Sequence, residues 1–363
     1  MKLCFLASAN SIHSYRWIKY FADKGHEIHW ISLQKSEFSD LQNTKFYLLK
    51  QFPAKFFEII FNVISVKNLV KKIKPDILHA HYAGVNGVLG ALSGFHPFIL
   101  TAWGSDILIA GKNFFIKPLI KFTLLKADLI TCDAEHMKEA IMKLGTKPEK
   151  IKIIYFGVDT KKFSPGPKDK ELIKKLNIEN CPVVISLRNL EPIYDVETLI
   201  KAIPLVLKEV PETKFIIAGK GSEEEKLKKL AEKLKVSKSI RFVGFILNDE
   251  LPKYLRTVDV YVSTSLSDAG ISASTAEAMA CGLPVIITKT GENEKWVKND
   301  EGGYLIPIKN PEILAEKIIF LVKNENLRKE FGTVNRAIIE EKNNYYKEME
   351  KMEKLYEEIF KKS

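Results

Sequence analysis

The chain has 363 residues, of which 46% are hydrophobic and 28% are charged, and its formal net charge is +11. This composition excludes a disordered, collagen-like or wholly coiled-coil chain, and the length predicts two domains of roughly 150 residues or more. No apolar run is long enough to span a membrane, and the four cysteines lie too far apart in the sequence to form a zinc or redox pair, which predicts a cytoplasmic protein.

Short apolar segments typical of strands alternate with segments of helical period. The first series of predicted strands covers residues 3–7, 27–33, 77–80, 98–102, 129–132 and 151–155. Residues 156–170, rich in glycine, proline and charge, form the predicted linker. The second series covers residues 183–187, 214–218, 240–243, 258–262, 284–288 and 303–307. The alternation predicts two doubly wound α/β domains, in which ligands bind beyond the carboxyl ends of the strands.

The most informative segment is 263–285, where a predicted strand ends in a small, polar loop that contains Gly270 and opens a helix near residues 272–274. Backbone amides at such a helix start, helped by the helix dipole, suit an anion such as a diphosphate. Glu277 lies one turn into the helix, where its carboxylate can accept two hydrogen bonds from a ribose diol. Gly270 alone also fits an ordinary turn, and Glu277 an ordinary capping carboxylate, but together they favour a nucleotide site.

The run from Glu277 to Val285 resembles the donor-site signature of retaining glycosyltransferases of the GT-B fold, in family four (glycosyl transferases group 1). Segments 155–165, 215–222 and 240–245 resemble further stretches of that family in the same order. The resemblance covers nearly the whole chain and is strongest in its second half. It implies two Rossmann-like domains that face a cleft: an acceptor-binding domain, 1–160, joined by a C-terminal helix crossing back at about 343–363, and a donor-binding domain, 161–342.

The resemblance also implies roles for individual residues of a donor site. Glu277 would hold the ribose of a nucleotide-sugar, the amides of Gly270, Ile271 and Ser272 would approach the diphosphate and the sugar, and Arg188 would pair with the diphosphate oxygens. The alternative for Arg188 is a surface ion pair. Phe245 would border the base, although an aromatic residue after a strand also fits the core. Lys220, between two glycines, is either a phosphate ligand or a turn residue.

Several positions depart from the family pattern. The family has two glutamates with seven residues between them, so counting back from Glu277 places Ala269 at the first, with Asp268 one residue further out. Sugar recognition must therefore differ, and we include Asp268 in the predicted donor site. A family lysine after Arg188 is replaced near Tyr194, which leaves the diphosphate one cation fewer. A family histidine corresponds to Trp103, so its catalytic contact cannot be transferred to this chain.

The first domain offers candidates for the acceptor side and for catalysis. His13 follows the first strand and could orient or deprotonate an acceptor hydroxyl, although a lone histidine at a helix start also fits a structural role. Asp106 is the predicted first-domain carboxylate that reaches the sugar. His79 and His81 end another strand, where we expect at most one to face the site. Two histidines without a nearby carboxylate do not predict a metal site.

The first half is also the basic half, because residues 1–160 carry 21 Lys and Arg against 13 Asp and Glu. Segments 56–74 and 112–126 combine apolar residues with lysines, a pattern that fits docking on an anionic membrane surface and also fits core helices whose lysines extend into solvent. We predict peripheral association with the inner face of a membrane. No array of aromatic and basic residues or groove-reading helix indicates nucleic acid, so nucleic acid is not an expected partner.

We therefore predict transfer of a sugar from a nucleotide-diphosphate sugar to a hydroxyl of a glycan, lipid-linked or small-molecule acceptor, with the retention that the resemblance implies. No Asp-x-Asp pair suits a metal, so we expect neither a metal nor another cofactor. The alternatives are a sugar-nucleotide epimerase of the same fold and a non-catalytic, two-lobed protein that binds a sugar or nucleotide. A dinucleotide-dependent oxidoreductase is disfavoured, because the loop after the first strand lacks glycine.

Overall fold

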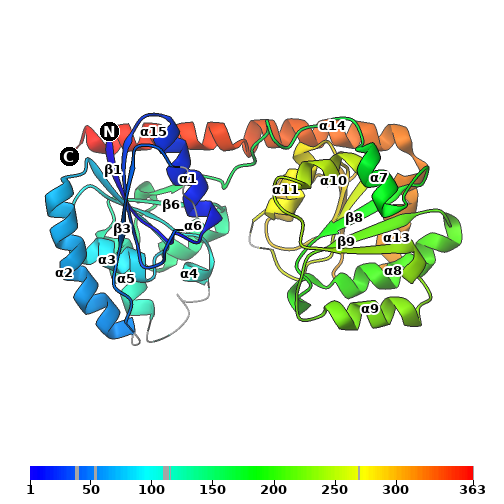
Figure 1. Ribbon diagram of the computed structural model, residues 1–363, viewed down its shortest axis with the longest axis horizontal. Coiled ribbons are helices and arrows are strands. Elements are labelled where there is room, and N and C mark those ends of the chain that lie inside the picture. Colours follow the sequence, from blue (N-terminus) through cyan, green and yellow to red (C-terminus); the bar gives the residue numbers. More distant parts are fainter. Residues whose placement is uncertain (37–40, 53–54, 109–113, 115, 269, 363) are drawn as a thin grey trace. The chain divides into compact units, whose positions relative to one another are not determined.

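Figure 1 shows a computed structural model that describes residues 1–36, 41–52, 55–108, 114, 116–268 and 270–362. The chain divides into two compact units, Met1–Phe156 with Tyr346–Ser363, and Gly157–Tyr345. The first crossing between the units falls at the start of the segment predicted as the linker. The C-terminal segment belongs to the first unit, so the chain passes between the units twice.

The described part of the first unit holds a seven-stranded parallel sheet with the order β3-β2-β1-β4-β5-β6-β7. Its strands are β1 (Lys2–Leu6), β2 (Glu27–Ser32), β3 (Thr44–Leu48), β4 (Ile77–His81), β5 (Phe98–Thr101), β6 (Leu129–Cys132) and β7 (Ile151–Ile153). Its helices include α1 (Ile12–Asp23), α2 (Lys55–Ile73), α3 (Val85–Ser93), α4 (Ser105–Leu108), α5 (Lys117–Lys126), α6 (Glu135–Lys143) and α15 (Tyr345–Phe360). The strand order is that of a doubly wound, Rossmann-like sheet, whose direction of winding switches between β1 and β4.

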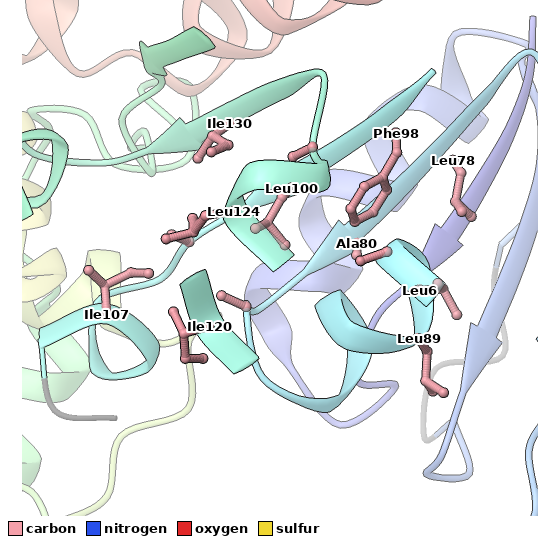
Figure 2. Packing of buried hydrophobic residues seen from close by; sticks show 14 of the residues in the cluster. Leu6, Leu78, Ala80, Leu89, Phe98, Leu100, Ile107, Ile120, Leu124 and Ile130 are labelled. Atoms are coloured by element: carbon pink, nitrogen blue, oxygen red, sulfur yellow. The ribbon is translucent and has the colours of Figure 1, made fainter. Parts of the chain in front are cut away.

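Side chains of a strand alternate between the two faces of a sheet, and in this sheet both faces carry buried side chains. Helices cover both faces. On one face, Leu78 of β4 and Phe98 of β5 are buried together with Leu89 of α3 and Leu124 of α5, as Figure 2 shows. On the other face, α1 and α15 are packed together, and the rings of Phe21 and Tyr356 lie 4.9 Å apart between centroids. The C-terminal helix is therefore part of the core of the first unit.

The described part of the second unit holds a six-stranded parallel sheet with the order β10-β9-β8-β11-β12-β13. Its strands are β8 (Val183–Leu187), β9 (Lys214–Ala218), β10 (Ile240–Gly244), β11 (Val260–Ser263), β12 (Val285–Thr288) and β13 (Gly303–Ile306). Its helices include α7 (Lys170–Leu176), α8 (Val196–Glu209), α9 (Glu224–Lys233), α10 (Leu251–Thr257), α11 (Ala273–Ala280), α12 (Asn293–Trp296), α13 (Pro311–Lys323) and α14 (Glu325–Lys342). This is again the doubly wound order, with its switch between β8 and β11.

The second unit has its own core, in which Ile203 of α8, Leu227 of α9 and Ile318 of α13 are fully buried. Behind the site described below, α14 packs against the end of α11. A Cβ on Gly332 of α14 would lie 2.0 Å from the carbonyl oxygen of Gly282, so a side chain there would push the two helices apart. This close approach fixes the position of α11.

The prediction of two doubly wound α/β domains is confirmed, and every predicted strand is present to within two residues at each end. The sequence analysis missed β3, which pairs with β2 at the edge of the first sheet. Most side chains of β3 are exposed, including those of Phe46 and Leu48. Only Thr44 and Tyr47 are partly buried, and they lie three residues apart, so burial in β3 does not alternate with the period of two that predicts a strand. The strand state of this segment therefore depends on pairing with β2.

Candidate functional site

A cavity of about 300 Å³ lies in the second unit, at the carboxyl ends of the strands next to the switch between β8 and β11. Arg188 follows β8, Gly219 follows β9, Phe245 follows β10, and Glu277 comes from α11. Their side chains or backbone line this one cavity. The structure therefore brings together three residues of the predicted donor site, Arg188, Phe245 and Glu277, from separate parts of the chain.

The loop after β8 lies close to the loop after β9 because of two glycines. Gly219 has a φ of +131°, and a Cβ on it would lie 2.3 Å from the carbonyl oxygen of Arg188. A Cβ on Gly221 would lie 2.2 Å from the carbonyl oxygen of Leu190. Leu190 also donates its N–H to the carbonyl of Lys220 over 3.0 Å. The glycines on either side of Lys220 therefore let the two loops approach each other and so position Arg188. This favours the interpretation of the Gly219-Lys220-Gly221 segment as a turn.

Arg188 forms a nearly buried ion pair in this cavity. Its Nη2 donates to Oδ1 of Asp268 over 2.7 Å, and the two side chains are only 9% and 8% exposed. The guanidinium lies over the ring of Tyr194, 4.4 Å from the ring centroid. Tyr194 stands where the family resemblance implies a lysine, so this position provides an aromatic face. Asp268 balances the charge of Arg188, as a buried cation requires.

The helix α11 begins at the cavity. Ser272 caps it, with its Oγ accepting the N–H of Thr275 over 3.2 Å, and Ser274 shares a hydrogen bond of 2.8 Å with the hydroxyl of Tyr261. Ser274 and Glu277 line the cavity, whereas Gly270 and Ile271 are half-buried residues that precede the cap. The predicted helix start is thus confirmed. Ala269, the position that corresponds to the first family glutamate, lies outside the described residues.

Phe245 and Lys220 lie at the exposed side of this region. The Phe245 side chain is 63% exposed and also lines the cavity, which excludes the alternative that it is a core residue. Lys220 is exposed, and its Cε lies 4.0 Å from the position that a Cβ on Gly244 would take. Lys220 is therefore next to the cavity, on the side formed by the end of β10.

This arrangement suits a nucleotide. The guanidinium of Arg188 can pair with phosphate oxygens, and the backbone amides at the start of α11 favour an anion. The Glu277 carboxylate can accept hydrogen bonds from a diol, and the exposed ring of Phe245 offers a flat apolar face to a base. A hydrophobic cavity with a few charged groups of this kind is typical of small-molecule sites.

Asp106 does not occupy the position predicted from the sequence. Its carboxyl is fully buried, with Oδ2 accepting the N–H of Ala83 over 2.8 Å and Oδ1 accepting those of Trp103 and Gly104 over 3.1 and 3.0 Å. Burial raises the pKa of Asp106, and these backbone hydrogen bonds partly offset the rise. The prediction that Asp106 reaches the sugar is therefore wrong, because its oxygens hold the loops after β4 and β5.

His13 lies at the start of α1, within the first unit. Its ring stacks on Trp103 at 5.3 Å between centroids and meets Phe156 edge-on at 4.4 Å. Part of the side chain remains exposed, but removal of water from the ring, followed by the positive charge of Arg16, lowers the pKa of His13 to about 4. A pKa this low makes the imidazole a weak base, which suits orienting a hydroxyl better than removing its proton.

The sequence analysis missed several residues that line the two cavities. In the second unit, Ser274 and Leu251 line the cavity beside the predicted residues, and Tyr194 supports Arg188. In the first unit, it missed Ser14, which lines a second cavity together with Trp103 and the predicted His13. Each of these follows a strand, so the rule that loops after strands carry ligands could have indicated the segments. Their contacts depend on chain reversals that a periodic pattern does not describe.

Within the described ranges, no cluster of three or more histidine, cysteine, aspartate or glutamate side chains could hold a metal ion. In those same ranges, no helix combines the length and the apolar character that crossing a bilayer would require.

Comparison with known families gives two matches. A family model described as Glycosyl transferases group 1 matches residues 168–337, and a model described as Glycosyl transferase 4-like matches residues 2–134. The first contains the cavity with Arg188 and Glu277, and the second contains most of the first unit. Together, the two matches cover most of the chain.

Individual proteins are similar over nearly the full length. The N-acetyl-alpha-D-glucosaminyl L-malate synthase of Bacillus anthracis is 24% identical over 364 residues, which span 94% of this chain and 92% of that protein. An uncharacterized glycosyltransferase of Methanocaldococcus jannaschii is 28% identical over 354 residues, 96% of this chain and 94% of that protein. The structure of Anabaena HepE in complex with UDP has a TM-score of 0.81 at 18% identity and covers 99% of this chain and 100% of its own, a likeness of fold.

Proposed function

Because this chain belongs to the group 1 family of glycosyl transferases, and is thus a glycosyltransferase of GT-B fold, we propose that it uses a nucleotide-diphosphate sugar as donor and transfers the sugar to an acceptor hydroxyl with retention of configuration. The donor would bind in the second unit, in the cavity between β8 and α11. The acceptor would bind in the first unit.

One observation carries the proposal: Arg188, Phe245 and Glu277 line a single cavity at the switch between β8 and β11. Each of the three parts of a nucleoside diphosphate then has a complementary group. The guanidinium faces the phosphates, the carboxylate the ribose, and the aromatic ring the base. The fold of HepE, which was solved with UDP and with UDP-glucose, supports a nucleotide-sugar donor.

In the proposed reaction, negative charge builds up on the leaving diphosphate as its bond to the sugar breaks. Fixed donors that point at this charge lower the barrier most effectively in a site closed to water. We assign this role to Arg188, which the ion pair with Asp268 and the ring of Tyr194 hold in place. His13 would orient the acceptor hydroxyl, and the departing phosphate would take its proton. We propose that no divalent metal takes part.

The function is tested by incubating the protein with UDP-, GDP- and ADP-sugars in the presence of EDTA, with and without candidate acceptors. Release of nucleoside diphosphate only when an acceptor is present, with the anomeric configuration of the donor kept in the product, supports the proposal. An epimerase would convert the sugar without an acceptor, and a binding protein would release no product. The family and its relatives do not favour either alternative.

Replacing Glu277 with alanine is expected to weaken nucleotide binding by about ten- to one-hundredfold, because a hydrogen bond to a charged group contributes about 1.5–3 kcal/mol. Thermal shift measures this directly, since a nucleotide at 100 times its dissociation constant adds about 2.7 kcal/mol of stability. Glu225→Ala is the matched control, because Glu225 lies on α9 with its side chain 78% exposed. If nucleotide gave equal thermal shifts in Glu277→Ala and Glu225→Ala, Glu277 would not be a nucleotide-binding residue.

We also propose that the first unit docks on an anionic membrane surface. On α2, Ile60, Phe61 and Ile64 are 44%, 51% and 60% exposed, and Lys67, Lys71 and Lys72 follow on the same helix. In the second basic segment, Phe114 and Leu125 are exposed at 83% and 49%. Lys112 and Phe115 of that segment lie outside the described residues. Each lysine near an anionic surface adds about 1 kcal/mol, and the exposed side chains can enter the headgroup region.

Membrane docking predicts co-sedimentation with phosphatidylglycerol vesicles but not with phosphatidylcholine vesicles. The double substitution Phe61→Ser and Ile64→Ser is expected to reduce the bound fraction severalfold, because it removes apolar area from the contact. Phe320→Ser, which changes a 48% exposed side chain on α13, is the control and should leave binding unchanged. Docking through α2 would be contradicted if the double variant and the Phe320→Ser control lost vesicle binding equally. Equal binding of the unchanged protein to both kinds of vesicle would also contradict it.

A further inference from the structure

The cavity proposed for the donor offers little positive charge to a diphosphate. Arg188 is the one cation among the described residues that line it, and the carboxylate of Glu277 lines it as well. The bond from Nη2 of Arg188 to Asp268 already balances the charge of the guanidinium. A diphosphate in this cavity therefore needs further hydrogen-bond donors, because a charged group removed from water is stable only where its oxygens are satisfied.

The Tyr194 hydroxyl is an uncharged donor that the protein itself leaves unused. Tyr194 is half-buried and lines the cavity, so part of its side chain is accessible to a ligand. In the part of the chain that the structure describes, no residue forms a hydrogen bond with this hydroxyl. The lining offers two other uncharged side-chain donors, but Ser274 is already bonded to Tyr261 over 2.8 Å, and Asn189 is exposed. The phenol is therefore the donor that best fits a ligand in this cavity.

The ring of Tyr194 lies against the guanidinium of Arg188, with 4.4 Å between the guanidinium carbon and the ring centroid. A cation over an aromatic face is attracted to it, so the ring favours one position of the guanidinium. Asp268 uses only one N–H of this guanidinium, which leaves the others for a ligand. The hydroxyl and these N–H groups stand on side chains in contact, and they can bond to the same anion.

The backbone that carries this ring is tied to the loop after β11. Tyr194 ends a short 3-10 helix, Pro192–Tyr194. The hydroxyl of Thr264 donates to the carbonyls of Tyr194 and Asp195 over 3.1 and 2.8 Å, and Thr264 is only 1% exposed. A fixed backbone limits the positions that the ring can take, which lowers the entropic cost when its hydroxyl binds a ligand.

We propose that Tyr194 determines how this site recognises a diphosphate: its hydroxyl donates to a phosphate oxygen beside Arg188, and its ring holds the guanidinium in place. The inference rests on the proposed function and adds to it a second side-chain donor for the phosphates, one without charge. It departs from the family pattern, in which the resemblance implies a lysine at this position. Because the added donor is neutral, binding should depend less on ionic strength than it would with a second cation.

The test measures the affinity of the full chain for UDP, GDP and ADP by isothermal titration calorimetry. Tyr194→Phe keeps the ring and removes only the hydroxyl. We expect it to weaken binding of the nucleoside diphosphate about tenfold, the effect of losing one hydrogen bond to a charged group, with an unchanged midpoint of urea unfolding. Tyr304→Phe is the matched control and should leave binding unchanged, because Tyr304 lines a separate cavity of the same unit.

A change of charge at the same position tests the contact with the phosphates a second time. Tyr194→Lys places a cation where we expect the phosphates, so its affinity for the nucleoside diphosphate should fall more steeply with added NaCl than that of the unchanged protein. Phe320→Lys adds the same charge on α13, where the side chain is 48% exposed, and should keep the native salt dependence. Equal salt dependence in all three proteins would mean that position 194 does not face the phosphates, and the inference would be wrong.

These outcomes distinguish the inference from the proposed function. If the unchanged protein and Tyr194→Phe bind the nucleoside diphosphate equally well, the role of the hydroxyl is wrong while the donor site stands. Weaker binding together with a lower midpoint of urea unfolding would make the hydroxyl a structural group and would also overturn the inference. If binding depends on Tyr194 but no sugar is transferred, the proposed function fails and the diphosphate contact remains. If the unchanged protein binds none of the three nucleotides, both are wrong.

Discussion

Replacing Arg188 with alanine is expected to lower kcat by about 100- to 1000-fold, the usual effect of removing one preorganised donor from a developing negative charge. The same change is expected to reduce the free energy of unfolding by about 3–5 kcal/mol, because it leaves the carboxylate of Asp268 buried without its partner. Steady-state release of nucleoside diphosphate measures the first effect, and urea unfolding measures the second.

The double substitution Arg188→Ala and Asp268→Ala separates these two effects. It removes both charges, so stability should largely recover while turnover stays low. Arg188→Lys keeps the charge but loses the planar guanidinium that faces Tyr194, and we expect an intermediate kcat. Recovery of turnover together with stability in the double variant would mean that Arg188 acts only through the fold, and the diphosphate assignment would then be abandoned.

The residues that line the candidate donor site could be predicted from the sequence to a large extent, because the segments that carry them are local. Small residues, a cap at Ser272 and a glutamate one turn later specify the start of α11 without help from distant residues. The position of Arg188 at the end of β8 follows from one apolar run of five residues. Long-range pairing then brings these segments together, and the doubly wound order makes that meeting point predictable.

The pairing within the site was not predictable. The ion pair between Arg188 and Asp268 joins residues 80 positions apart, and the contact of Arg188 with Tyr194 depends on a short 3-10 helix after β8. A sequence shows that a cation and a carboxylate follow neighbouring strands, but not that they neutralise each other. The same limit applies to His79 and His81, whose different hydrogen bonds come from Tyr356, Thr101 and Ser14.

Asp106 shows the clearest failure of sequence reasoning. A carboxylate in a loop after a strand fits a ligand contact, but a short loop also contains backbone N–H groups that need acceptors when they are buried. Asp106 accepts N–H groups from two loops, after β4 and after β5. Such a residue positions the loops around it, here the segment that carries Trp103.

Replacing Asp106 with alanine is therefore expected to lower the free energy of unfolding by about 3 kcal/mol or more, since three buried N–H groups lose their acceptor at about 1–3 kcal/mol each. Asp106→Asn keeps one acceptor oxygen and should lose less. Urea unfolding measures both changes. The thermal shift with nucleotide should persist in either variant, because the proposed donor cavity belongs to the second unit.

A carboxylate that contacts the ligand and a buried carboxylate that holds loops predict different effects on KM and on stability. A carboxylate that touched the transferred sugar would be surrounded by solvent in the free protein, so its loss would raise the KM for the donor and leave stability nearly unchanged. The buried carboxylate in the structure predicts the opposite pattern, a large loss of stability with an unchanged KM in the fraction that stays folded. A stable Asp106→Ala protein with a raised donor KM would restore the role inferred from the sequence.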